Sequence, residues 1–275
     1  MSVKKEASGR RSIQVETEVP GTPEEVWQAI ATGQGISAWF VPAEFEEQDG
    51  KPVAVTLNFG PGMESRSIVT AWDPPRMFAK EAEGWFPGSP RIGTEWSVEA
   101  RSGGVCLVRV VQSLFAETDD WDQQLIGTES GWPGAFRVLR LYLAHFCGQH
   151  SAFMQFMAPV AGTVPEAWAK LTEALGLNGA DVGQDWAVPA SVPELGGVIE
   201  QLSESPPPGA LLRLDRPGPG VAALFTMTWG DSVMVVFTFY LYGDRAAETA
   251  ARETPLWQAW LQERFPTPTE PSNSE

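Results

Sequence analysis

The chain has 275 residues and a formal net charge of −16, from 19 Lys and Arg against 35 Asp and Glu. This acidic balance argues against nucleic acid as a partner, because a phosphate-binding surface needs clustered basic side chains. Hydrophobic residues make up 43% of the chain, with 12 Trp and 14 Phe, which excludes disorder over its whole length and allows one large domain or two ordinary ones.

The cysteine content and the N-terminal segment bear on the compartment. Cys106 and Cys147 are too few for a secreted disulfide framework or a cysteine-rich zinc site. No apolar run follows the basic residues near the N-terminus, so the sequence predicts no signal peptide, and no stretch is apolar over the roughly 18 residues of a membrane-spanning helix. We therefore expect a cytoplasmic protein in a reducing environment.

The first half begins with a strand and a well-specified helix. Residues 13–19 alternate between apolar and polar, the pattern of a half-buried strand. Thr22 is a good helix N-cap, Pro23 suits the first helical position, and Glu25 completes a capping box. The sequence thus fixes where this helix starts.

Further strands and a second helix follow in the first half. A short amphipathic piece is expected over residues 36–40, and the acidic residues 44–49 are interpreted as a solvated loop. Apolar runs separated by Gly and Pro turns predict strands at residues 53–59, 66–72, 76–81, 94–101 and 105–115. Apolar residues at three- and four-residue spacing then predict an amphipathic helix over residues 133–146.

The second half repeats the first in order. Residues 19–30 and 160–171 are identical at five of twelve positions, and Thr163 with Glu166 forms a second capping box. Strands are expected at 153–160, 198–203, 210–215, 221–229 and 232–242 before a closing helix around Trp257. The second copy is shorter by roughly a strand pair. These patterns predict disordered residues 1–11, a first domain over 12–147, a shorter, degenerate second domain over 152–265, and a disordered tail over 266–275.

The first half resembles the START-like helix-grip superfamily, also called SRPBCC, in the branch named after the activator of a heat-shock chaperone ATPase. The similar segments are VPGTPEEVW at residues 19–27, AWF at 38–40, DPP at 73–75, TEWSV at 94–98, GG at 103–104, VRVV at 108–111, GWP at 131–133 and LRLYL at 139–143. The resemblance implies an α+β fold of two tandem units, each a curved antiparallel sheet wrapped around a long C-terminal helix. A cavity that takes an apolar ligand is implied between sheet and helix. It implies no cofactor and no shared catalytic residues.

Several other chemistries find little support in the sequence. His145 and His150 lack the further ligands that a zinc site needs, so no metal is expected. Cys106 lies in an apolar run where a free cysteine usually packs as a small hydrophobic residue, and no motif of a serine nucleophile or a phosphate loop is present. The acidic cluster at residues 119–122 could bind a cation, but acids at a helix start are favoured by the helix dipole alone.

Aromatic residues are the remaining signal for a site. Each of them has core packing as its ordinary role. Because small-ligand pockets are concave and mostly apolar, we nevertheless predict a ligand site from this set, with the two loop residues at 85 and 86 as a lid: Trp39, Phe40, Trp85, Phe86, Trp96, Trp132 and Phe136. Arg66, Arg109 and Arg137 could point inward and orient a polar head group.

These observations leave three functions open. The leading hypothesis is binding of a small apolar or amphipathic ligand in the first unit, with the second unit as a structural or self-association module. The alternatives are a protein-interaction module of co-chaperone type and an enzyme similar to polyketide cyclases or hydrolases. An enzyme would need two or more titratable residues within reach of one another in the cavity, and the sequence places none there.

Overall fold

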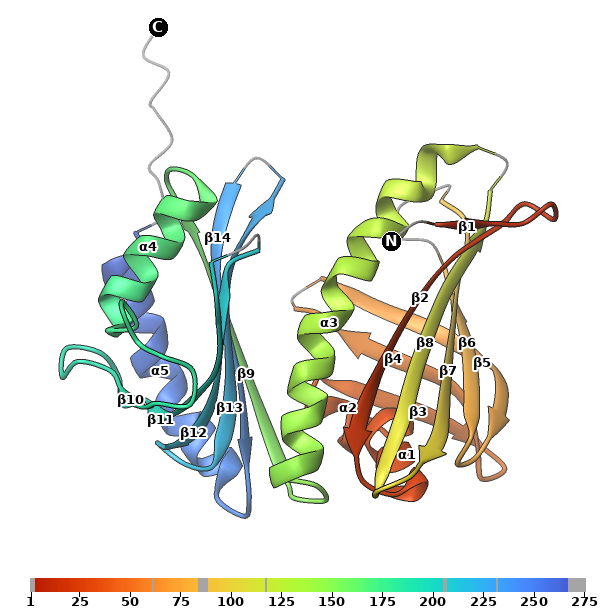
Figure 1. Cartoon of the computed structure of the whole chain (residues 1–275), viewed down its shortest axis with the longest axis horizontal. Helices are drawn as coiled ribbons and strands as arrows, with labels where there is room; N and C mark the ends of the chain where they lie inside the picture. Colours follow the sequence, from red (N-terminus) through yellow and green to blue (C-terminus); the bar gives the residue numbers. More distant parts are fainter. Residues whose placement is uncertain are drawn as a thin grey trace, which may run out of the picture. The chain divides into compact units, whose positions relative to one another are not determined.

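The computed structural model describes residues 3–266 except 61, 84–88, 117, 205, 206 and 231. The chain divides into two compact units, Met1–Gly148 and Gln149–Glu275 (Figure 1). Each unit is an antiparallel sheet with helices packed on one face, which confirms the predicted α+β class and the tandem helix-grip arrangement. The division falls within the polar stretch 147–152, next to the two predicted domain limits.

The described strands of the first unit form an eight-stranded sheet in the order β1-β2-β8-β7-β6-β5-β4-β3. Their bounds are β1 Lys4–Lys5, β2 Arg10–Pro20, β3 Ala43–Gln48, β4 Lys51–Asn58, β5 Glu64–Asp73, β6 Met77–Ala82, β7 Ile92–Arg101 and β8 Val105–Phe115. The helical elements are α1 Pro23–Ala31, α2 Gly33–Ser37, the 3-10 turn Asp119–Trp121 and α3 Asp122–His145. Helix α3 lies along the sheet of this unit (Figure 1).

Helix α1 starts where its capping residues predict. The Glu25 backbone N–H donates to Thr22 Oγ1 at 3.2 Å, and the Thr22 N–H donates to Glu25 Oε2 at 2.8 Å. This reciprocal pair satisfies two of the N–H groups that a helix start leaves without intrahelical partners. Behind the cap, Val26, Trp27 and Ile30 are buried, so the helix is anchored by its apolar face.

The acidic segment predicted as a loop is strand β3, Ala43–Gln48, which pairs with β4. That prediction was wrong because the charged residues in this segment hide the alternation of partly buried and exposed side chains that is typical of a strand. Ala43 and Phe45 pack as partly buried residues against the small cluster of Ile36, Val41 and Val55, whereas Glu44 and Glu46 alternate with them along the strand.

Helix α3 begins eleven residues earlier than predicted, and Pro133 lies inside it rather than at its start. The glycines and the proline before Phe136 are poor helix formers, so they conceal the helical pattern in the sequence. Leu125 and Trp132 are buried on the same face as Phe136 and Leu139, at spacings of seven, four and three residues. Packing of this long face outweighs the low local propensity.

The N-terminal segment is also more ordered than predicted. Strand β2 starts at Arg10, and Lys4 and Lys5 pair with Ser12 and Arg11 in strand β1. The predicted disordered tail over residues 266–275 falls outside the described residues except for Pro266. No helix of the described chain is both long and apolar enough to cross a membrane.

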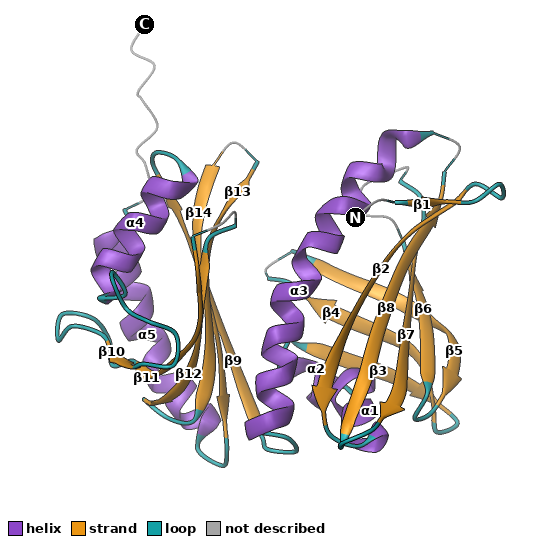
Figure 2. Ribbon diagram, viewed as in Figure 1, coloured by secondary structure: helices purple, strands orange, loops and turns teal. Residues whose placement is uncertain are grey.

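The described strands of the second unit form a six-stranded sheet in the order β10-β11-β12-β13-β14-β9. Helices α4 and α5 both cover one face of it (Figure 2). The bounds are β9 Ser151–Val160, α4 Val164–Leu175, β10 Asp185–Ala187, β11 Gly196–Ser203, β12 Gly209–Arg216, β13 Gly220–Trp229, β14 Ser232–Tyr242 and α5 Ala246–Arg264. Thr163 and Glu166 form the same capping box as in α1, so the repeated sequence builds a repeated helix start.

Candidate ligand-binding site

The inner face of the first sheet, which α3 covers, carries an aromatic row. Cross-strand pairing aligns Phe78 on β6 with Trp96 on β7, and their rings stack with centroids 6.3 Å apart. Trp72 on β5 is the partner of Phe78 on its other side, at a ring distance of 5.6 Å. Because strand side chains alternate between faces, this row fixes which residues of β6 and β7 face inward.

Helix α3 and the segment after α2 close over this row with more aromatic rings. Trp96 contacts Trp132 at 5.1 Å and Phe136 at 6.0 Å, and Phe40 stacks on Trp132 at 5.5 Å. Trp39 reaches Trp96 at 6.2 Å and is almost fully buried. The structure therefore brings together five of the predicted site residues, while Trp85 and Phe86 lie outside the described residues.

A second row on the same inner face is polar. Lys80 on β6 pairs with Thr94 on β7, and Thr94 pairs with Gln112 on β8. Lys80 lies two residues beyond Phe78 and Thr94 two residues before Trp96, so both point to the aromatic side. Their residual exposures are 9% for Lys80, 8% for Thr94 and 7% for Gln112. Three polar side chains thus line up, buried, beside the aromatic row.

Gln112 connects this row to the helix. The indole Nε1 of Trp132 donates a hydrogen bond of 2.9 Å to Gln112 Oε1. The bond satisfies the buried indole and orients the Gln112 amide, whose nitrogen then carries the donors. Trp132 is therefore held by both ring contacts and a hydrogen bond.

Lys80 stands out from its neighbours in charge. Within the described residues, no side chain forms a hydrogen bond or an ion pair with its ammonium, and the nitrogen atom itself keeps a small exposed area. Burial alone lowers the pKa of Lys80 from 10.5 to about 8. Since buried charges are normally paired, a solitary ammonium beside two neutral polar side chains is an unusual feature of an interior.

The three arginines suggested as inward-pointing are not part of this site. Arg66 is half exposed and donates to both carboxylate oxygens of Glu46 at 2.7 Å. Arg109 makes a 3.1 Å ion pair with Glu16, and Arg137 is exposed on α3. Lys80, Thr94 and Gln112 were missed, although the alternation in Met77–Ala82 would have placed Lys80 on the face of Phe78.

The acidic cluster before α3 has a structural role. Asp122 accepts from Lys5 Nζ at 2.8 Å and from Arg11 Nη1 at 2.7 Å, and Asp119 accepts from the same two side chains. Hydrogen bonds from Lys5 and Arg11 lower the pKa of Asp119 and of Asp122. These pairs tie β1 and β2 to the start of α3.

Both cysteines of the described chain are free thiols with a raised pKa. Cys106 is buried in β8, donates to the Gly21 carbonyl at 3.3 Å, and has its pKa raised by burial, which keeps it a thiol. Cys147 is exposed as a residue, but partial burial of its sulfur raises the pKa of the thiol. Across the described ranges, no three His, Cys, Asp or Glu side chains gather as metal ligands.

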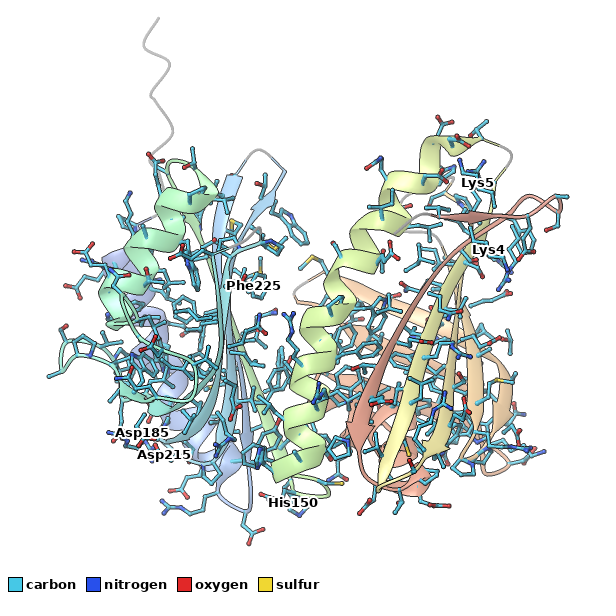
Figure 3. All side chains as sticks on the ribbon, in the orientation of Figure 1. Lys4, Lys5, His150, Asp185, Asp215 and Phe225 are labelled. Carbon is cyan, nitrogen blue, oxygen red and sulfur yellow. The ribbon has the colours of Figure 1, made fainter. Side chains whose placement is uncertain are left out.

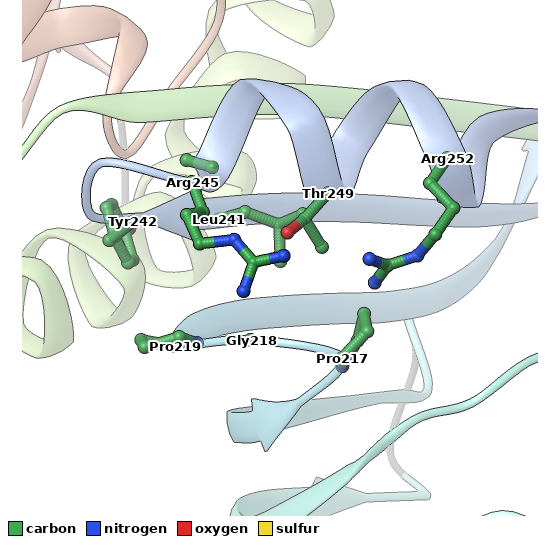
Figure 4. A pocket seen from close by; sticks show the side chains of 9 residues that line it. Pro217, Gly218, Pro219, Leu241, Tyr242, Arg245, Thr249 and Arg252 are labelled. Atoms are coloured by element: carbon green, nitrogen blue, oxygen red, sulfur yellow. The ribbon is translucent and has the colours of Figure 1, made fainter.

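Two surface pockets are lined by residues other than those of the aromatic cluster. In the second unit, a pocket of about 180 Å³ lies between the loop at Pro217 and Pro219 and the start of α5, with Arg245, Thr249 and Arg252 on the helix side (Figure 4). In the first unit, a pocket of about 470 Å³ is lined partly by Arg10, Gln14 and Glu95. Inside the first unit, side chains occupy the space between α3 and the sheet (Figure 3).

Comparisons with known proteins agree with this architecture. Residues 10–138 match a family model described as polyketide cyclase / dehydrase and lipid transport. No curated protein matches the chain.

Solved structures similar to the chain include one single-unit match and two that extend over both units. CalU16 from Micromonospora echinospora is 19% identical, over 52% of this chain and 83% of its own, with a TM-score of 0.41. DynU16, from the dynemicin biosynthetic locus, is 16% identical over 92% and 95%, with a TM-score of 0.40. BexL, a di-domain ARO/CYC from the BE-7585A biosynthetic pathway, is 12% identical over 94% and 100%, with a TM-score of 0.43.

The family match covers the elements from β2 into α3, which include the aromatic row and the polar row. The antiparallel sheet and the long closing helix α3 described above are the features that the sequence resemblance implies. Residues 10–138, the larger part of the first unit, are therefore similar to this polyketide cyclase / dehydrase and lipid transport family.

Proposed function

We propose that the first unit binds a small amphipathic molecule between the inner face of its sheet and helix α3. The observation that carries this proposal is the polar row of Lys80, Thr94 and Gln112 set beside a buried aromatic row. A purely structural core would gain stability from apolar side chains at these positions, because burying polar groups costs free energy unless they are paired. Ligand pockets combine an apolar lining with a few polar groups in this way.

The site is closed by ring contacts rather than open. Trp96, Trp132 and Phe136 touch one another, and each is at least nine-tenths buried. A ligand must therefore separate these rings and take over their contacts. Flat or flexible apolar molecules suit such a place, because they can replace aromatic surface with aromatic or aliphatic surface.

Binding accounts for the interior better than catalysis does. Among the inward-facing residues of β6 and β7, all of which are described, Lys80 is the one titratable side chain. General acid and base work needs a second such group within hydrogen-bond reach. We therefore propose carriage or sensing of a molecule rather than its conversion.

The test is native mass spectrometry of the full chain after gentle purification, with solvent extraction to identify a bound molecule. We expect a stoichiometric adduct that Trp96→Ala abolishes while circular dichroism still reports a folded protein. Trp229→Ala is the matched control, because Trp229 lies in the second unit and is 52% exposed. Absence of an adduct, together with no uptake of lipids or aromatic acids and alcohols, would contradict the proposal.

A further inference from the structure

We propose that the ligand of the first unit carries one acidic group, a carboxylate or an ionised phenol or enol, and that Lys80 holds it. This inference rests on the proposed binding function and specifies the ligand class. It starts from the place of Lys80 in the sheet. Strand pairing on both sides of β6 opposes Lys80 to Thr94 and to Val69, so the inward direction of its side chain is fixed by the backbone.

The position of Lys80 is costly for a residue with no counter-ion. A lysine near a surface normally extends its ammonium into water, whereas this side chain is more than nine-tenths buried. No carboxylate of the described residues pairs with it. Glu81 and Glu95 alternate to the opposite face, and Glu129 on α3, half-buried, makes no ion pair with it. An anionic ligand would supply the missing partner.

The neighbours of Lys80 suit an anionic oxygen group as well. Thr94 offers a hydroxyl donor in the adjacent strand. The Gln112 oxygen already accepts from Trp132, so its amide N–H groups remain available to donate. Three donors therefore follow one another across β6, β7 and β8, and each lies directly opposite its neighbour in the strand register.

The charge of the row selects among anions. It contains a single cation, which matches a singly charged carboxylate or enolate better than a phosphate, since phosphate sites usually combine several basic side chains or backbone N–H groups. The aromatic row beside it, with Trp96 and Phe78, would contact the apolar remainder of the ligand. An aromatic or aliphatic acid fits both rows.

The experiment compares matched acids and alcohols by isothermal titration calorimetry of the full chain at pH 7. The probes are naphthalene-2-carboxylate with naphthalen-2-ylmethanol, and dodecanoate with dodecan-1-ol. We expect each acid to bind about tenfold or more tightly than its alcohol, as one charge-assisted hydrogen bond would give. Lys80→Met should remove this preference and leave alcohol affinity within about twofold.

Three further samples keep the result interpretable. Lys51→Met is the matched control, because Lys51 is an exposed lysine at the start of β4, and it should behave as the wild type. Lys80→Gln removes the charge but keeps a polar group, and Lys80→Arg should retain the acid preference. Circular dichroism checks that each variant is folded.

The possible failures are distinguishable. Binding of acids and alcohols with equal affinity, or an acid preference that survives Lys80→Met, would overturn the acidic ligand class and leave the binding function standing. Failure of the wild type to bind any of the four probes, with no adduct in native mass spectrometry, would overturn both the function and this inference.

Discussion

The interiors of the two units differ although the scaffold repeats. In the second unit, the row that crosses β14, β13 and β12 consists of Phe237, Leu224 and Ala210, all apolar and buried. In the first unit, a row that likewise crosses three neighbouring strands, β6, β7 and β8, consists of Lys80, Thr94 and Gln112. The same sheet and helix architecture thus holds a mostly apolar interior in the second copy, where Thr226 is a buried polar residue on the same face of β13, and a row of three polar side chains in the first copy. For this reason we place ligand binding in the first unit.

The second unit also buries one charged side chain, but that charge is paired, unlike the charge of Lys80. Glu253 on α5 is 3% exposed, and its Oε1 accepts from Arg252 Nε at 2.8 Å. Glu253 Oε2 is completely enclosed and has no hydrogen-bond partner. Its charge is nevertheless compensated by Arg252, whereas that of Lys80 meets no acidic side chain.

The largest expected effect on stability is that of Trp257→Ala, which removes a buried aromatic ring from the second unit. Trp257 is 1% exposed and contacts Phe237 and Phe239 at 5.5 and 5.1 Å. Trp257→Ala should lower the free energy of unfolding by about 3–5 kcal/mol, because it leaves a large cavity. Urea unfolding would measure this loss, and the exposed Trp229→Ala should change stability by less than about 0.5 kcal/mol. A mild effect at Trp257 would mean that the second interior is not close-packed.

Lys80→Met should stabilise the first unit by up to about 3 kcal/mol below pH 8, from the lowering of the Lys80 pKa from 10.5 to about 8. Below pH 8 both the folded and the unfolded wild type carry the charge. Between pH 8 and 10.5 the folded state releases the proton first, so wild-type stability rises and the advantage of the variant disappears. Unfolding curves at pH 7 and pH 10.5 would test this, with Lys51→Met unchanged at both. A stabilisation that does not depend on pH would point to packing instead.

An intermediate effect is expected at the bond between Gln112 and Trp132. Gln112→Leu leaves the buried indole N–H of Trp132 without its acceptor and should cost about 1–3 kcal/mol. Trp132→Phe in the same chain removes the stranded donor, so the double variant should recover part of this loss. A double-mutant cycle by chemical denaturation measures the coupling. Additive losses would show that the bond contributes little.

The smallest effect is expected on the outer surface of the first unit. Arg66 and Glu46 form a bidentate pair, but both side chains are about half exposed. Arg66→Ala should cost less than about 1 kcal/mol and leave ligand binding unchanged, since surface ion pairs are weak. Thermal denaturation and the calorimetric titration together would check this. If Arg66→Ala abolished ligand binding, Arg66 would have to contact the ligand despite its exposed position.

The sequence predicts most of the fold because its strongest signals are local. The capping boxes at Thr22 and Thr163 and the alternation along most strands depend on neighbouring residues alone. Strand β3 and the first half of α3 were missed because charged residues in one case, and glycines with Pro133 in the other, oppose the local pattern. Tertiary packing decides these segments, and a single sequence does not display it.

The candidate site was predictable in its aromatic part only. The large apolar rings of Trp96 and Trp132 predict a place in an apolar site, and in the structure the two rings are in contact. The polar row depends on strand register, since Lys80, Thr94 and Gln112 are far apart in the chain and meet only when β6, β7 and β8 pair. The charge of Arg66 and Arg109 suggests a role in orienting a polar head group, but pairing with Glu46 and Glu16 keeps both side chains at the surface.

The hydrogen bond from Trp132 to Gln112 has a kinetic consequence. Because this bond joins α3 to β8 beside the ring contacts, we expect the proposed ligand to enter after the bond and the adjoining ring contacts have opened. Entry is then governed by an opening step that precedes encounter, and the observed association rate should reach a plateau as ligand concentration rises. We expect Gln112→Leu to raise this maximum association rate. Gln112 would then both stabilise the ligand-free protein and limit the rate of ligand entry.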